Sequence, residues 1–356
     1  MKAIKLKFLV AGITAGSILL SGIVQAEQTL TFRIGTGGAG GTYYPVGSTI
    51  ATAISEPEET KSCDQVAMCG VRGVTATALV TKASVQNVTE VQAGLMESGI
   101  VDAATLHFAY KGIKKFKNDK KEDIRVIANL YPEDLHLVLP KGSKIKGLAD
   151  LYGKRVGIAQ AGSGTQSSVE LILASYGIDR SNIEEFELNQ TETAKLMAAG
   201  KLDAYFYAAG TPVSTISKLA EDSGVELYSF SDEEVRQANK AVPYYIPSTI
   251  KAGVYPGVDY DVKTLAVSAM LVTHTNQPED LIYNIVRTMW GERSRFLFDN
   301  GHRKAKVITL DSALNGLDGI GVPLHPGAEK FYKRACLFTV PRSENTLQRF
   351  PIVCGR

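Results

Sequence analysis

The sequence predicts an α/β fold made of two similar units with mostly parallel sheets, because one local pattern occurs twice. An apolar strand at residues 29–34 leads into a glycine-rich loop and then a helix over about 45–54. The same order returns in the strand at 155–159, the loop Gly162–Thr165 and the helix at 167–176. Strands that alternate with helices are typical of parallel sheets. The 356-residue chain is also longer than one hydrophobic core usually supports, which favours two domains.

A second correspondence between the halves supports the repeat. In each half a strand is followed by a helix with a polar cap and a terminal glycine, and then by another strand. The apolar residues Val85, Val88 and Val91 follow helical spacing in the first of these helices. The segments are residues 75–81, Ser84–Gly94 and 98–101 in the first half, and 183–188, Thr191–Gly200 and 202–207 in the second.

The loops that follow the strands are predicted to meet in a cleft between the two units. Ligands of such sheets collect beyond the carboxyl ends of the strands. Four segments lie there, two from each unit, at residues 37–44, 81–84, 162–166 and 207–211. A binding site between the units follows from this arrangement.

The first of these loops has the composition of an anion-binding turn. Five glycines stand between Gly35 and Gly41, so that backbone N–H groups can approach a ligand closely at the start of a helix. The helix dipole favours negative charge at that position. Thr42 and two tyrosines add hydroxyl groups and aromatic faces, and Pro45 suits the first helical turn. We therefore expect the loop to hold a small acid.

The amino terminus predicts export from the cytoplasm. Lys2, Lys5 and Lys7 precede the apolar run 8–24, and small residues follow it. Residues 1–26 are therefore interpreted as a cleaved signal peptide, and the protein as periplasmic. The alternative is a retained membrane anchor.

The charge of the chain gives no reason to expect a nucleic acid or an anionic membrane as a partner. The formal net charge is +2, and removal of residues 1–26, which hold three lysines and no acidic residue, changes it to −1. The basic run at 111–121 is followed by Glu122 and Asp123, and it is interpreted as a solvated face.

The four cysteines are predicted to form two disulfides, as expected of an exported protein. Proximity in the sequence favours the pairs Cys63 with Cys69 and Cys336 with Cys354, and free thiols are the alternative. Neither pair has the spacing of a zinc knuckle, and no histidine lies close to them in the sequence. No metal site is expected.

Enzymatic interpretations find little support in the sequence. Residues 35–40 satisfy the GxGxxG pattern of dinucleotide-binding enzymes, but no convincing acidic residue follows the next strand, and tyrosines fit a pyrophosphate turn poorly. Residues 162–164 are not a GxSxG elbow, and the five histidines are dispersed without an HExxH motif. We expect neither catalysis nor a cofactor.

Six short segments occur in the order in which they occur in one family of binding proteins. They are GTGGAGGTYYPVG at residues 35–47, Ala83–Asn87, Leu130–Glu133, Gly162–Thr165, Tyr207–Pro212 and Ala252–Gly257. On these residues the chain resembles the TAXI family, the extracytoplasmic solute-binding subunits of a class of TRAP transporters. The resemblance runs from about Leu30 to Tyr332 and depends on all six segments together.

The resemblance implies a type II periplasmic-binding-protein fold, in which two α/β lobes are joined by a two-strand hinge and close on a ligand. It implies that lobe 1 consists of residues 27–135 plus 266–356, and lobe 2 of residues 136–265. The partners it implies are a small solute and an integral-membrane TRAP permease driven by an ion gradient, and the protein is expected to be a monomer. A ligand-sensing subunit with the same fold is the alternative.

Ligands of this family are small organic acids, dicarboxylates and glutamate-like amino acids, and the loops suit such ligands. Backbone N–H groups near Gly40 and Thr42 are expected to bind a carboxylate, helped by hydroxyls from both lobes. Tyrosines are expected to pack against the carbon skeleton. The predicted ligand-binding residues are Gly38, Gly40, Gly41, Thr42, Tyr43, Tyr44, Thr81, Ser84, Asp102, Ser163, Gly164, Thr165, Tyr207, Gly210 and Thr211.

Asp102 departs from the family pattern. Relatives commonly have Gln-Ser-Asp or Gln-Ala-Asp where this chain has Asp102-Ala103-Ala104. A carboxylate that faces the pocket repels a second acid group and favours an amine or a hydroxyl. A solvent-facing Asp102 is the alternative, and the sequence leaves both open. Ser163 and Thr165 also fit the simpler role of helix caps.

Overall fold

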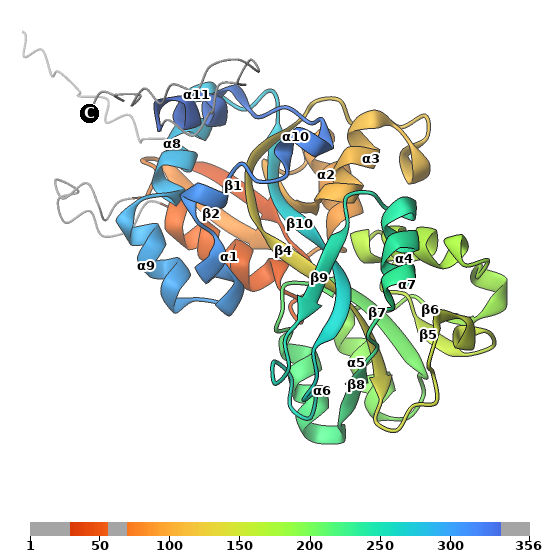
Figure 1. Cartoon of the computed structure of the whole chain (residues 1–356). Coiled ribbons are helices and arrows are strands. Elements are labelled where there is room, and N and C mark those ends of the chain that lie inside the picture. The colour runs from red at the N-terminus through yellow and green to blue at the C-terminus, as the bar shows by residue number, and fades with distance from the viewer. Residues whose placement is uncertain (1–28, 56–69, 336–356) are drawn as a thin grey trace, which may run out of the picture.

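The computed structural model of the chain describes residues 29–55 and 70–335 (Figure 1). The predicted signal peptide and the four cysteines lie outside these ranges. Over the same ranges, every helix is too short or too polar to cross a lipid bilayer.

Two long strands connect two groups of elements, which we name the first and the second lobe (Figure 1). The strands are β4 (Ile124–Pro140) and β10 (Val262–His274), and they run antiparallel to each other. They pair over residues 124–134 and 266–274, with register shifts at two places. The exact lobe boundaries at 135/136 and 265/266 stay a prediction.

The first lobe combines amino-terminal and carboxyl-terminal elements. Tyr332 is fully buried and its hydroxyl donates to the Ile127 carbonyl over 3.0 Å, which ties the last helix to β4. The elements are β1 (Leu30–Gly35), α1 (Tyr43–Ile54), β2 (Val74–Leu79), α2 (Ser84–Gln92), β3 (Ser98–Asp102), α3 (Ala103–Lys111), α8 (Glu279–Met289), α9 (Glu292–Asn300), α10 (Leu317–Ile320) and α11 (Pro326–Arg334), with the short 3-10 helices η2 (Lys114–Phe116), η5 (Arg303–Val307) and η6 (Leu310–Ser312).

The second lobe is formed by the middle of the chain. Its helices pack on a core that includes Tyr205, Ile216 and Tyr255, each fully buried. The elements are β5 (Arg155–Gly157), α4 (Gly164–Ser175), β6 (Glu184–Phe186), α5 (Gln190–Ala198), β7 (Ala204–Ala209), α6 (Ser214–Ser223), β8 (Val225–Leu227), α7 (Asp232–Ala241) and β9 (Ile246–Ile250), with η3 (Leu148–Leu151) and η4 (Arg180–Asn182).

The strands form one ten-stranded sheet in the order β2-β1-β3-β10-β4-β7-β5-β6, with β8 beside β4 and β9 beside β10. This is an α/β fold of two lobes joined by two strands, as predicted. The sheet is mixed rather than mostly parallel. The pairs of β1 with β2 and β3, and of β5 with β6 and β7, are parallel, but every pair that includes β4 or β10 is antiparallel.

The repeated unit predicted from the sequence is present in both lobes. Each predicted strand and helix exists, with ends shifted by a few residues. Two caps differ from the prediction. Ser84 does not cap α2, because the helix begins at Ser84 and the residue before it is Ala83. Asn189, not Thr191, caps α5, because its side chain accepts the N–H of Glu192 over 3.0 Å. Thr191 lies inside the first turn.

Candidate functional site

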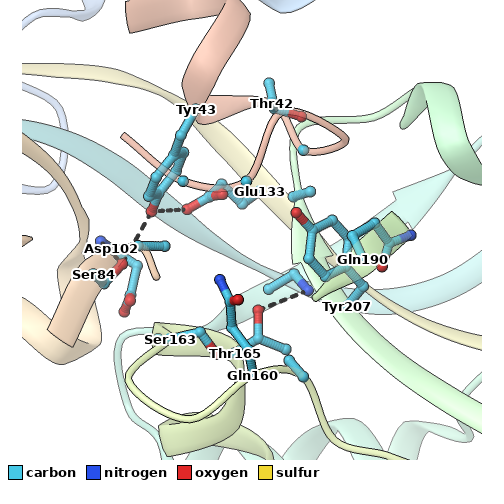
Figure 2. Close-up of a pocket in the computed structure, with 18 of the residues that line it drawn as sticks. Thr42, Tyr43, Ser84, Asp102, Glu133, Gln160, Ser163, Thr165, Gln190 and Tyr207 are labelled. Carbon is cyan, nitrogen blue, oxygen red and sulfur yellow. Dashed lines mark hydrogen bonds between the residues drawn. The ribbon is translucent and has the colours of Figure 1, made fainter. Parts of the chain in front are cut away.

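A cavity of about 50 Å³ lies between the lobes, at the carboxyl ends of the strands (Figure 2). Both lobes contribute to its wall, as the sequence predicted for a cleft between two units. The first lobe and β4 supply Gly37, Gly38, Gly41, Thr42, Tyr43, Ala83, Ser84, Asp102 and Glu133; the second supplies Ala159, Gln160, Ser163, Gly164, Thr165, Leu188, Asn189, Gln190, Tyr207, Ala208, Ala209 and Tyr245.

Five helices begin at this cavity. Backbone N–H groups of a first helical turn lack acceptors within the helix, and the dipole places partial positive charge there. The cavity therefore concentrates amide donors from both lobes, the arrangement expected of an anion-binding site. The lining residues at the five starts are Tyr43 of α1, Ser84 of α2, the α3 cap Asp102, Gly164 of α4 and Gln190 of α5.

The first-lobe wall is a chain of hydrogen bonds around Tyr43. The Tyr43 hydroxyl donates to Glu133 Oε2 over 2.8 Å and lies 3.3 Å from Ser84 Oγ (Figure 2). Ser84 Oγ also accepts the backbone N–H of Asp102 over 3.1 Å. Glu133 is only 3% exposed, and burial raises its pKa well above the usual range, reinforced by the negative charge of Asp102. Glu133 therefore resists ionisation in this setting.

Asp102 caps α3 with one of its two carboxylate oxygens, and the other oxygen takes no part in the cap. Its Oδ1 accepts the Thr105 N–H over 2.8 Å, which fixes the side chain at the start of α3. Its Oδ2 is buried and has no hydrogen-bond partner among the described residues. Asp102 is 3% exposed and lines the cavity, so the solvent-facing alternative is wrong. Burial raises its pKa, although the hydrogen bonds it accepts lower it.

The second-lobe wall is built around the start of α4. Ser163 caps that helix by accepting the Gln166 N–H over 3.1 Å, so its predicted capping role is confirmed. Thr165 lies inside the first turn and is not a cap, because its hydroxyl accepts the Ala208 N–H over 3.2 Å and ties α4 to β7. The N–H groups of Gly164 and Thr165 belong to the first turn of the helix and have no acceptor within it. These two amides belong to residues that line the cavity.

The lobes touch at the rim of the cavity. Thr42 Oγ1 donates to the Gly210 carbonyl over 3.0 Å, and the Gln86 N–H donates to the Gly162 carbonyl over 3.3 Å. Glycine is needed where the lobes approach most closely. A Cβ added at Gly164 would lie 1.8 Å from Asp102 Oδ2, and one at Gly41 would lie 2.2 Å from the Tyr207 hydroxyl. The structure is therefore a closed arrangement of the two lobes.

Ten of the fifteen residues predicted to bind ligand line the cavity, and five do not. Thr81 donates instead to the Thr36 carbonyl and to Asn87 Oδ1, which stabilises the loop from outside. The peptide bond between Thr211 and Pro212 is cis. The hydroxyl Oγ1 of Thr211 lies 3.3 Å from His136 Nε2. The residues outside the lining are Gly40, Tyr44, Thr81, Gly210 and Thr211.

Sequence reasoning missed five polar residues of the wall: Glu133, Gln160, Asn189, Gln190 and Tyr245. Glu133 stands in a segment that carried the family resemblance, and that was its only signal. The Tyr245 hydroxyl is buried and has no partner among the described residues. Tyr245 belongs to the segment before β9, far in sequence from every loop that was expected to reach the cleft.

A cationic residue lies behind the wall. Lys304 of η5 is near Glu133 and Asp134, and burial lowers its pKa while these two carboxylates raise it. Its side chain packs against Gly210 of the second lobe, where an added Cβ would lie 2.4 Å from Lys304 Cγ. Lys304 does not line the cavity, and the described lining contains no lysine or arginine. An acid bound here would therefore meet backbone amides and hydroxyls rather than cationic side chains.

Comparison with known proteins gives a family and several distant structural likenesses. The chain is similar to the alkanesulfonate-binding protein SsuA from Xanthomonas axonopodis pv. citri bound to MOPS, at 16% identity over 85% of this chain and 83% of that chain, with a TM-score of 0.41. It is also similar to a binding protein component of an ABC phosphonate transporter from Pseudomonas aeruginosa, at 11% identity over 76% and 78% of the two chains, with a TM-score of 0.46. A sequence model of the NMT1-like family matches residues 34–335, which is most of the chain, and the protein therefore belongs to the NMT1-like family.

Proposed function

We propose that the chain is an exported solute-binding protein that captures a small carboxylate-bearing solute and delivers it to a membrane permease. The solute is an organic acid or an amino acid, held in the cavity between the lobes. The observation that carries this proposal is the convergence of five helix starts from both lobes on one closed cavity.

The start of α4 is a suitable position to bind a ligand carboxylate. The N–H groups of Gly164 and Thr165 can donate to it there, and α1 offers the N–H of Tyr43 from the other lobe. Each charge-assisted hydrogen bond contributes about 1.5–3 kcal/mol. Because the two sets of donors come from different lobes, a ligand that uses both stabilises the closed arrangement.

Delivery to the membrane is the less direct part of the proposal. The six sequence segments that resemble the TAXI family favour a TRAP-type permease, which uses an ion gradient. We therefore expect uptake by the protein with its permease in proteoliposomes to stop when the ion gradient is abolished and to proceed without ATP. Uptake that requires ATP instead would reject the TRAP assignment and leave solute binding intact.

Solute capture is tested by a thermal-shift screen of the mature protein against amino acids and organic acids. A ligand that binds the folded state alone adds about 2.7 kcal/mol of stability at a concentration of 100 times Kd. We therefore expect at least one carboxylate-bearing compound to raise Tm by several degrees, with a stoichiometry of one per chain by calorimetry. Amides and esters of the same compound serve as controls, since they lack the carboxylate. A complete screen without a shift would contradict the proposed function.

A further inference from the structure

The unpartnered oxygen of Asp102 is a polar group of the cavity that has no role in the proposed carboxylate-binding position at the start of α4. Asp102 Oδ1 is occupied by the cap of α3, whereas Oδ2 is buried without a partner among the described residues. A buried polar atom without a hydrogen bond destabilises the folded protein, and more so when it is charged. The side chain cannot turn away to find water, because the cap holds it and only 3% of the residue is exposed.

The surroundings of Asp102 Oδ2 favour a donor and disfavour an acid. Glu133, the second buried carboxyl group of the cavity, is close enough for its pKa to respond to the charge of Asp102. Of the nearby hydroxyls, Tyr43 donates to Glu133, whereas Ser84, which accepts the Asp102 N–H, and Tyr245, which has no partner among the described residues, keep a proton to donate. The described lining offers no lysine or arginine to neutralise the carboxylate. A ligand carboxylate placed there would therefore meet like charge.

The position of Asp102 Oδ2 relative to α4 adds a geometric constraint. A Cβ at Gly164 would lie 1.8 Å from this oxygen, so the oxygen faces the first residue of α4. A carboxylate acceptor and the amide donors of Gly164 and Thr165 thus lie next to each other, across the junction of the lobes. An amine and a carboxylate borne on the same or adjacent carbon atoms match this pair of sites.

We propose that Asp102 Oδ2 binds a protonated amine of the solute, so that the cleft selects amine-bearing acids over the corresponding acids without an amine. This inference rests on the proposed function and narrows it to α-amino acids and close analogues. The carboxylate of the solute then occupies the start of α4, and the ammonium group supplies the hydrogen bond that Asp102 Oδ2 lacks. A charged hydrogen bond of this kind corresponds to at least a tenfold difference in affinity.

Calorimetry with matched pairs of compounds tests the inference. The pairs are glutamate with glutarate, aspartate with succinate, and glutamine with glutaramate, each differing only in the α-amine. We expect the amine-bearing member of the bound pair to bind at least ten times more tightly. In Asp102→Asn this preference is expected to fall to less than threefold, because asparagine keeps the cap of α3 but not the charge. The free variant should keep the Tm of the wild type within a few degrees.

Asp179→Asn is the matched control, because Asp179 also caps a short helix through its side chain but does not line the cavity. It should keep the full preference for the amine. Equal affinity for both members of a pair, or an amine preference that survives Asp102→Asn, would overturn the inference while leaving the proposed function standing. Absence of binding by every member of all pairs and of the wider screen would overturn both.

Discussion

Gly164→Val is expected to abolish ligand binding, with a loss of affinity of at least a hundredfold. In the closed arrangement a Cβ at this position would lie 1.8 Å from Asp102 Oδ2 and 2.9 Å from Ser84 Oγ, both in the other lobe. Asp102 cannot retreat easily, because its Oδ1 is bound to the Thr105 N–H and the residue is buried. The lobes must therefore stay apart, and a ligand that depends on contacts with both of them is lost.

Gly164→Val is expected to prevent closure of the two lobes without reducing the stability of the folded protein. The three atoms nearest to the added Cβ all belong to the first lobe, so the clash lies between the lobes. We expect Tm without ligand to change little, and the ligand-induced rise in Tm to vanish. Small-angle scattering should show that ligand reduces the radius of gyration of the wild type but not of the variant.

Gly38→Ala is the matched control for this experiment. Gly38 also lines the cavity, but a Cβ there meets no atom within 4 Å. It should retain closure by scattering, which separates the clash between the lobes from a change in the cavity lining. Gly164→Ala is expected to fall between the two. If Gly164→Val binds ligand as tightly as the wild type, the closed arrangement described above is not the ligand-bound one.

The local part of the fold was predictable from the sequence, because it depends on short patterns. Strand, glycine loop and helix follow each other over about twenty residues, and helix caps such as Ser163 act within three residues. The direction of β4 and β10 was not predictable in this way. These strands pass between the lobes, and their antiparallel pairing depends on partners far away in the chain.

The site shows the same division between local and distant information. The sequence indicated two tyrosines at the start of α1 without deciding which one faces the ligand. Helix α1 begins at Tyr43 rather than near Pro45, and adjacent residues of a helix point about 100° apart, so Tyr43 lines the cavity and Tyr44 does not. Tyr245 could not be found from local patterns, because only the packing of distant segments brings it to Asp102.

Glu133→Gln is expected to remove a pH dependence from the stability of the protein. Burial and the charge of Asp102 raise the pKa of Glu133 in the folded state, so the folded protein binds this proton more tightly than the unfolded chain. The stabilisation is complete below the unfolded pKa, near 4.5, and is lost as pH rises toward the folded pKa. In that window the free energy of unfolding falls by up to about 1.4 kcal/mol per pH unit.

His136 adds an opposing pH dependence that is common to the wild type and to Glu133→Gln. Burial lowers the pKa of His136, so its titration makes the folded state more stable as pH rises toward 6.5, which opposes the effect of Glu133. The difference in free energy of unfolding between the two proteins therefore isolates Glu133. We expect urea unfolding from pH 4.5 upward to show that the wild type loses stability relative to Glu133→Gln as pH rises.

Glu97→Gln provides a control of opposite sign. Glu97 forms an ion pair with Arg33 over 2.6 Å, and its hydrogen bonds with Arg33 hold its pKa below the usual value although burial opposes them. It is ionised in both states above pH 6.5, so its substitution should lower stability by a constant amount there. A wild-type profile that runs parallel to both variants would mean that Glu133 is already ionised in the closed cleft, and the cavity would then carry two negative charges for a ligand to neutralise.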